Sequence, residues 1–189
     1  MSRISSQHLA NARLAFFIFL TPCIFLAPQI FREDLGLSNY GINPSTIVFY
    51  FLGFLSSVLF LALASNILLA KKSATHTKVA WSLRIIAVLQ LALLLVPDSK
   101  NDNIRHLHVN IGLTLFMAEF LFGWWLVFRS HGKALDWFLA ILQSLAGISA
   151  YLSLLNILKL EAPSQMVFQL SFMTLCVESV RRMEKPKFK

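Results

Sequence analysis

The chain has 189 residues, of which 57% are hydrophobic and 14% are charged, and its formal net charge is +8. This composition, with a mean hydropathy of +0.66, is typical of an integral membrane protein and excludes an ordinary soluble domain. The length leaves room for about six bilayer-spanning helices of roughly 20 residues each, in one domain over residues 1–189, and for no sizeable soluble domain besides.

Six apolar segments follow one another along the chain, over residues 14–31, 47–70, 79–97, 107–128, 135–158 and 163–180. In lipid every backbone polar group must be satisfied within the segment, and the period-two alternation of a barrel is absent. The sequence therefore predicts an all-α fold, a polytopic bundle of about six transmembrane helices. Pro22 is expected to bend the first of them, because proline removes a backbone donor in mid-helix.

Basic residues are divided unequally between the two sides that this topology creates. Four would lie on one side, namely Arg32, Lys100, Arg105 and Lys159. The other side, which holds both termini, would carry 13 of the 17: Arg3, Arg13, Lys71, Lys72, Lys78, Arg84, Arg129, Lys133, Arg181, Arg182, Lys185, Lys187 and Lys189. Because cytoplasmic connections are enriched in Lys and Arg, both termini are predicted to be cytoplasmic, in the plasma membrane. Basic residues arranged in this way do not form a phosphate-binding groove, so no nucleic-acid partner is expected.

The fourth segment carries an ionisable residue near the middle of the membrane, Glu119. At 100° per residue, His108, Gly112, Glu119 and Gly123 fall within about 60° of one another on one stripe. Glycines allow another helix to approach closely, so this stripe is expected to face protein. Glu119 lies about 17 Å along the helix from His108, near the bilayer midplane, where an ionisable group is a functional-site hypothesis by default.

Glu119 has two interpretations. It can be a protonated carboxylic acid that hydrogen-bonds a neighbouring helix and fixes the packing, or it can bind a ligand or carry a proton. Gln90, Gln143 and Gln169 lie near the middle of their own segments, and any of them is a candidate partner. Since no Lys or Arg lies at the same depth, we expect the neutral form of the carboxyl group.

The connection between the third and fourth segments concentrates Asp98, Asp102, His106 and His108. These residue types bind zinc and serve in acid/base catalysis, so the four are candidate catalytic residues. A solvated or helix-capping loop is the plainer interpretation. His-x-His falls short of a zinc signature, and the two cysteines lack metal-ligand spacing, so neither a metal nor a cofactor is expected.

The connection over residues 32–44 is rich in turn formers, and it either returns the chain to the membrane or forms an ordered lid over the opening of the bundle. It holds Leu37-Ser38-Asn39-Tyr40-Gly41 and Pro44, and further on Val96-Pro97 is followed by Leu107-His108. With these motifs, the chain resembles a family of six-helix membrane proteins of unknown biochemical function, related to the damage-regulated autophagy modulator group. In that family the first motif usually reads Ile-Ser-Asp-Leu-Gly, so Asn39 stands where an acid is usual. The resemblance implies the same topology, with Ser38, Asn39 and His108 meeting near the external surface.

These features favour a membrane-embedded binding or accessory protein over an enzyme. Its ligand would be a membrane lipid or another small amphiphile, and its partner a second membrane protein or another copy of the chain. Glu119, Gln90, Gln143, Gln169, Ser38 and Asn39 are the candidate ligand-binding residues. A membrane hydrolase or transferase that acts on lipid headgroups is the alternative, and a small transporter is the third hypothesis.

Overall fold

The structure is a computed structural model that describes residues 4–33, 35–99, 101–129 and 132–184. Over these residues it is helical and contains no strand, which confirms the predicted all-α fold. The helices are α1 (Ile4–Leu26), α2 (Pro28–Arg32), the 3-10 helix η1 (Leu37–Gly41), α3 (Ile47–Ala70), α4 (Ala74–Leu95), α5 (Asp102–Arg129), α6 (Ala134–Leu154) and α7 (Glu161–Met183).

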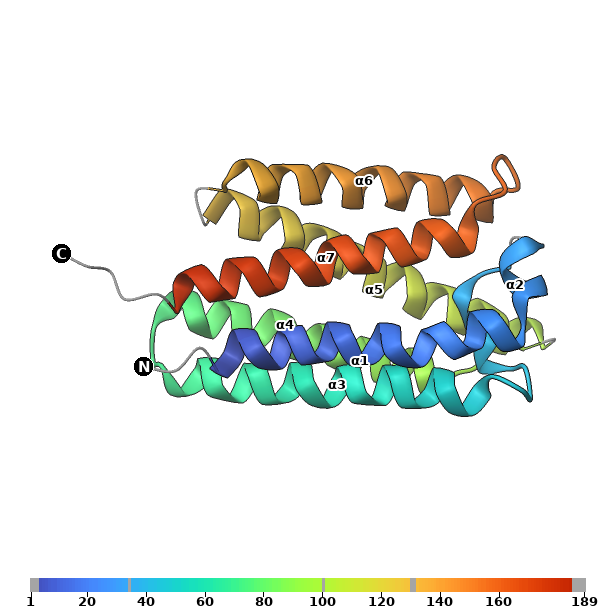
Figure 1. Cartoon of the computed structure of the whole chain (residues 1–189), viewed down its shortest axis with the longest axis horizontal. Coiled ribbons are helices and arrows are strands. Elements are labelled where there is room, and N and C mark those ends of the chain that lie inside the picture. The colour runs from blue at the N-terminus through green and yellow to red at the C-terminus, as the bar shows by residue number, and fades with distance from the viewer. Residues whose placement is uncertain (1–3, 34, 100, 130–131, 185–189) are drawn as a thin grey trace.

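The six long helices run up and down beside one another (Figure 1). α1 begins and α7 ends at one end of the bundle, here named the terminal end, where α3 also connects to α4 and α5 to α6. The opposite, distal end holds α2, η1 and the connections from α4 to α5 and from α6 to α7. The sequence predicts this alternation of sides. Of the basic residues counted above, Arg3, Lys100, Lys185, Lys187 and Lys189 lie outside the described residues.

Five helices are long and apolar enough to cross a membrane, namely α1, α3, α4, α5 and α6, so the chain is a helical integral membrane protein. The predicted segment 163–180 corresponds to α7, which has 23 residues but does not match the apolar character of the other five. Its polar side chains include Ser164, Ser171 and Ser179, which are buried in the bundle. A helix that packs its polar groups against protein does not need an apolar perimeter, and composition alone therefore supports five spans rather than six.

The first predicted segment, 14–31, is two helices in the structure. α1 begins at Ile4 and continues through Pro22, and the break comes instead between Leu26 and Pro28, where α2 begins. Proline is tolerated in the first turn of a helix because the N–H it lacks has no partner there, so Pro28 favours a new start. α4 and α5 likewise begin at Ala74 and Asp102, before the predicted 79 and 107, since both helices extend beyond their apolar runs.

α6 ends earlier than the predicted residue 158, at a well-defined cap. Asn156 has a φ of 58°, in the left-handed region that asparagine tolerates better than most residues. Its N–H donates to the Ser153 carbonyl at 2.8 Å, and the Ile157 N–H donates to the Leu152 carbonyl at 2.9 Å. This pair of bonds is the Schellman motif, and it turns the chain toward α7.

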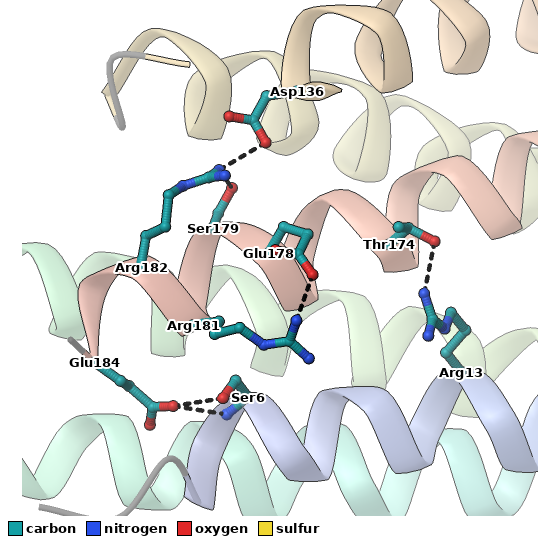
Figure 2. Close-up of polar contacts among 9 residues, drawn as sticks. All are labelled: Ser6, Arg13, Asp136, Thr174, Glu178, Ser179, Arg181, Arg182 and Glu184. Atoms are coloured by element: carbon teal, nitrogen blue, oxygen red, sulfur yellow. Dashed lines mark hydrogen bonds and ion pairs between the residues drawn. The ribbon is translucent and has the colours of Figure 1, made fainter. Parts of the chain in front are cut away.

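At the terminal end, one carboxylate joins three helices. The Ser5 N–H donates to Glu184, which follows α7, at 3.1 Å. Glu184 accepts two further hydrogen bonds, from the Ser6 N–H at 3.2 Å and from the Ser6 hydroxyl at 2.6 Å (Figure 2). It also pairs with Lys71 at the end of α3, at 2.8 Å. Burial alone raises the pKa of Glu184, but the hydrogen bonds from Lys71, Ser6 and Ser5 outweigh it and lower that pKa to about 2. The carboxylate thus supplies the N-terminal cap of α1.

Two further ion pairs lie nearby in Figure 2, and they differ from the pairing that sequence spacing suggests. Arg182 lies four residues after Glu178, but it pairs with the fully buried Asp136 of α6, at 2.6 Å. Glu178 pairs instead with Arg181, at 2.7 Å. The buried carboxylate needs a cation more than the partly exposed Glu178 does, so the contact between helices replaces the local one.

Candidate ligand-binding cavity

A cavity of about 890 Å³ extends from the distal end into the bundle. Residues of α5, α6 and α7 form most of its wall, and η1, α1, α3, α4 and the distal connections contribute the rest. Along α5 its lining runs from Arg105 to Phe120, and the part from His108 to Glu119 extends about 17 Å inward, or about one leaflet of a bilayer. Its volume falls within the range of roughly 300–1,000 Å³ that small-molecule sites occupy.

Charged residues of both signs line the distal part of the cavity, which is here named the mouth. Glu33, Asp98 and Glu161 are acidic, and Arg105 and Lys159 are basic. Of these, only Asp98 was predicted from the sequence as a site residue. Arg105 and Lys159 contributed only to the predicted orientation, because nothing in their spacing shows that the start of α5 and the connection from α6 to α7 meet at one opening.

Apolar side chains line the cavity between its mouth and its deep end, including Phe54, Phe116 and Phe168. Leu113 of α5 and Ile148 of α6 line it as well, and both are exposed, by 39% and 58%. α5 lies beside α6 near the terminal end and diverges from it toward the distal end (Figure 1).

The deep end of the cavity holds Glu119, which is fully buried. Gln90 of α4 donates from Nε2 to Glu119 Oε1 at 3.4 Å, and Gln169 of α7 donates from Nε2 to Oε2 at 2.7 Å. Gln143 of α6 donates to the backbone carbonyl of Glu119 at 3.3 Å. All three glutamines expected as candidate partners thus contact Glu119, each from a different helix. The Gln90 Oε1 atom in turn accepts from the Ser57 hydroxyl at 3.2 Å.

This cluster, named here the glutamine cluster (Gln90, Glu119, Gln143 and Gln169), leaves two amide oxygens unpaired among the described residues. The Oε1 atoms of Gln143 and Gln169 are buried and have no hydrogen-bond partner among the described residues. Glu119 and Gln169 line the cavity, whereas Gln90 and Gln143 lie behind them. Each carboxyl oxygen of Glu119 thus accepts an amide N–H, one from α4 and one from α7.

His108 lies at the mouth and contacts Val96, so the motifs Val96-Pro97 and Leu107-His108 meet in the structure. Its Nδ1 is 2.6 Å from the carbonyl oxygen of Val96, the residue that ends α4. Because a carbonyl only accepts, Nδ1 carries the proton, and Nε2 of the neutral ring is then an acceptor. The histidine therefore fixes the end of α4 against the start of α5.

The four candidate catalytic residues do not gather at one point. Asp98 and His108 line the cavity, but Asp102 and His106 are exposed on the first turns of α5 and do not line it. The reason is that α5 begins at Asp102, so His106 and His108 both belong to the helix, and residues two apart do not share a helical face. Among the described residues, no three His, Cys, Asp or Glu side chains gather as metal ligands would.

The motif over residues 37–41 forms η1 and fixes the first connection against α3 and α7. The Leu37 N–H donates to Oε1 of Gln165 in α7 at 2.8 Å, and the Thr46 hydroxyl donates to the carbonyl of the fully buried Tyr40 at 2.7 Å. Ser38 and Asn39 line the cavity together with His108, so the three residues that the resemblance places together do share one space. Gln165 was missed in the sequence, because a glutamine near a helix start resembles any solvated residue.

The glycines of α5 have different surroundings, although both were expected to face other helices. A Cβ atom added at Gly123 would lie 2.5 Å from Oε1 of Gln143, so α6 packs directly on this glycine. At Gly112 the same atom would meet only Cδ1 of Leu93, at an ordinary 3.7 Å, and Gly112 lines the cavity. The stripe faces the protein interior, as predicted, but at Gly112 that interior is hollow. Gly147 of α6, whose added Cβ would collide with Phe116, is a second close contact.

Comparisons with protein-family models, curated protein sequences and solved structures found no significant match to this chain.

Proposed function

We propose that this chain is an integral membrane protein that binds a membrane lipid or a similar amphiphile in the cavity between α5, α6 and α7. One observation carries the proposal, namely that a single cavity joins a mouth with charges of both signs to apolar walls about one leaflet deep. An amphiphile has the same order of polarity along its length. A water-soluble metabolite would leave these walls without complementary contacts.

The proposed topology has six spans, with α7 as the sixth and both termini in the cytoplasm. The charge distribution supports this orientation, since most of the described basic residues lie at the terminal end. The cavity would then open to the outer leaflet of the plasma membrane, with the connection over residues 32–44 as a lid at its mouth. Such a topology agrees with the resemblance to the six-helix family.

A second candidate function is a hydrolase or transferase that acts on the lipid headgroup. The observation that favours it is the position of Asp98 and His108 in the lining of the same mouth, with Nε2 of His108 left as an acceptor. An imidazole oriented by a carbonyl at Nδ1 is a common arrangement for a general base. Incubation of the purified protein with phospholipid vesicles, followed by lipid mass spectrometry, would reveal an altered headgroup under this hypothesis and an unchanged lipid under simple binding.

The test of binding is native mass spectrometry of the gently extracted protein, with a variant that fills the cavity. Gly112→Leu places a large side chain in the cavity without a clash at Cβ, and the signal of the lipid-bound protein should disappear from the mass spectrum. Thr114→Leu is the matched control, because Thr114 is exposed on the same helix and its hydroxyl bonds only to the backbone of Asn110. If wild-type protein retains no amphiphile, or if Gly112→Leu retains as much as wild type, the proposal is wrong.

A further inference from the structure

The cavity is polar at both ends, which is unusual for a site that would hold a simple lipid tail. Its mouth carries Arg105 and Lys159 beside acidic residues, and its deep end is formed by Glu119 and Gln169. Between them the wall is mostly apolar. A tail that ends in a methyl group would place that methyl against a carboxyl group in the least polar part of the membrane.

From this arrangement we infer that the ligand is an elongated amphiphile with polar groups at both ends, whose inner end donates a hydrogen bond, as a hydroxyl or an amine, to Glu119 and Gln169. This inference rests on the proposed binding function and adds the chemical class of the ligand. The outer end is an anionic or zwitterionic group that pairs with Arg105 and Lys159.

The hydrogen-bond inventory of the deep end leaves acceptors that a donor on the ligand can satisfy. Gln90 and Gln169 each use an amide N–H on the Glu119 side chain, and Gln143 uses one on its backbone carbonyl. What remains is a second N–H on each amide, the spare acceptor capacity of the Glu119 oxygens, and the buried Oε1 of Gln169, which has no hydrogen-bond partner among the described residues. A hydroxyl or amine at this point satisfies an acceptor that an alkyl chain leaves unpaired.

The length of the cavity sets the separation of the two polar groups. His108 at the mouth and Glu119 at the deep end are both on α5, about 17 Å apart along its axis. This is close to the thickness of one leaflet, about 15 Å, so a single extended chain with a polar group at each end spans the cavity. A ligand with its second polar group near the first would leave the deep end unsatisfied.

The experiment compares three fatty acids that share one chain length, namely palmitic acid, ω-hydroxypalmitic acid and α-hydroxypalmitic acid. Dissociation constants are measured by titration calorimetry on the purified full-length protein in detergent. The ω-hydroxyl group is expected to tighten binding about tenfold over palmitic acid, as one satisfied buried hydrogen bond would, although it makes the chain less hydrophobic. The α-hydroxyl group, which stays at the mouth, should give no such gain.

Two variants locate the effect. Gln169→Met keeps the shape of the side chain and removes the acceptor Oε1, together with the N–H that binds Glu119, so the advantage of the ω-hydroxyl group should fall while palmitic acid still binds. Gln143→Met is the matched control, because Gln143 belongs to the same cluster but does not line the cavity, and the advantage should remain. Melting temperatures show whether each variant is folded, and the three-ligand comparison on wild-type protein tests the inference without them.

The outcomes separate the inference from the proposed function. Equal affinity for palmitic and ω-hydroxypalmitic acid, both lost in Gly112→Leu, would overturn the donor at the deep end and leave lipid binding intact. An equal gain from the α-hydroxyl group would also overturn it, because the hydroxyl would then act at the mouth. Binding of none of the three, together with no retained amphiphile in the native mass spectrum, would overturn both.

Discussion

The carboxylate of Glu184 offers a sharp test of how the helices are held together at the terminal end. The change Glu184→Gln removes the charge and one acceptor from a side chain that is 1% exposed and that bonds Ser5, Ser6 and Lys71. A helix cap and a charge-assisted hydrogen bond each contribute about 1–2 kcal/mol, so the loss should be about 2 kcal/mol. For a chain of this size that corresponds to a fall in melting temperature of roughly 4–8 °C.

The pH dependence of this effect has a definite sign. The folded pKa of Glu184, about 2, lies below its ordinary value of 4.5, so the carboxylate stabilises the fold above about pH 4.5 and loses this contribution as the pH falls toward 2. Thermal unfolding in detergent should therefore show a gap between wild type and Glu184→Gln at pH 7 that shrinks at pH 3. Glu178→Gln, which alters a more exposed pair on the same helix, should change stability by less than about 1 kcal/mol at either pH. A gap for Glu184→Gln that is equal at the two pH values would refute the linkage, and no gap at pH 7 would refute the cap.

Two further predictions concern α5 and the orientation of the bundle. Gly123→Leu should destabilise the protein in detergent by about 1–3 kcal/mol through overpacking on α6. Gly112→Leu should leave the melting temperature unchanged or slightly higher, because Gly112 lines the cavity. A larger loss of stability in Gly112→Leu than in Gly123→Leu would show that the cavity does not lie beside Gly112. A cysteine at Asn101 should react with a membrane-impermeant reagent in intact cells and one at Ser73 should not, because these residues lie in the distal and terminal connections. Reaction at Ser73 alone would reverse the proposed orientation.

The helices and the buried stripe of α5 could be predicted from the sequence because both follow from local rules. An apolar run in lipid must be helical, and the 100° step places His108, Glu119 and Gly123 on one face. The contacts of Gln90 and Gln169 with Glu119 could also be predicted from the sequence, since polar groups at the same depth of a membrane hydrogen-bond one another.

What lies opposite a given face depends on the tertiary arrangement, and periodicity does not supply it. The hollow beside Gly112 arises where α5 diverges from α6, and no residue on α5 encodes that angle by itself. Arg182 similarly pairs with Asp136, 46 residues away, rather than with Glu178 one turn before it. The meeting of Arg105 and Lys159 at one mouth also joins the start of α5 to the connection from α6 to α7, which is distant in the chain.

The polar character of α7 has a consequence for how the protein enters the membrane. A translocon partitions each segment into lipid by its hydrophobicity. α7 carries Gln165, Gln169 and Glu178 along its length, so it is expected to partition poorly into lipid when it is alone. Some of its polar side chains find partners on other helices, as Gln169 does on α5 and Arg182 on α6. We therefore expect α7 to be inserted late, as a hairpin with α6 and against helices that are already in place. Cross-linking of nascent chains of increasing length would show α7 contacting α6 before it contacts lipid.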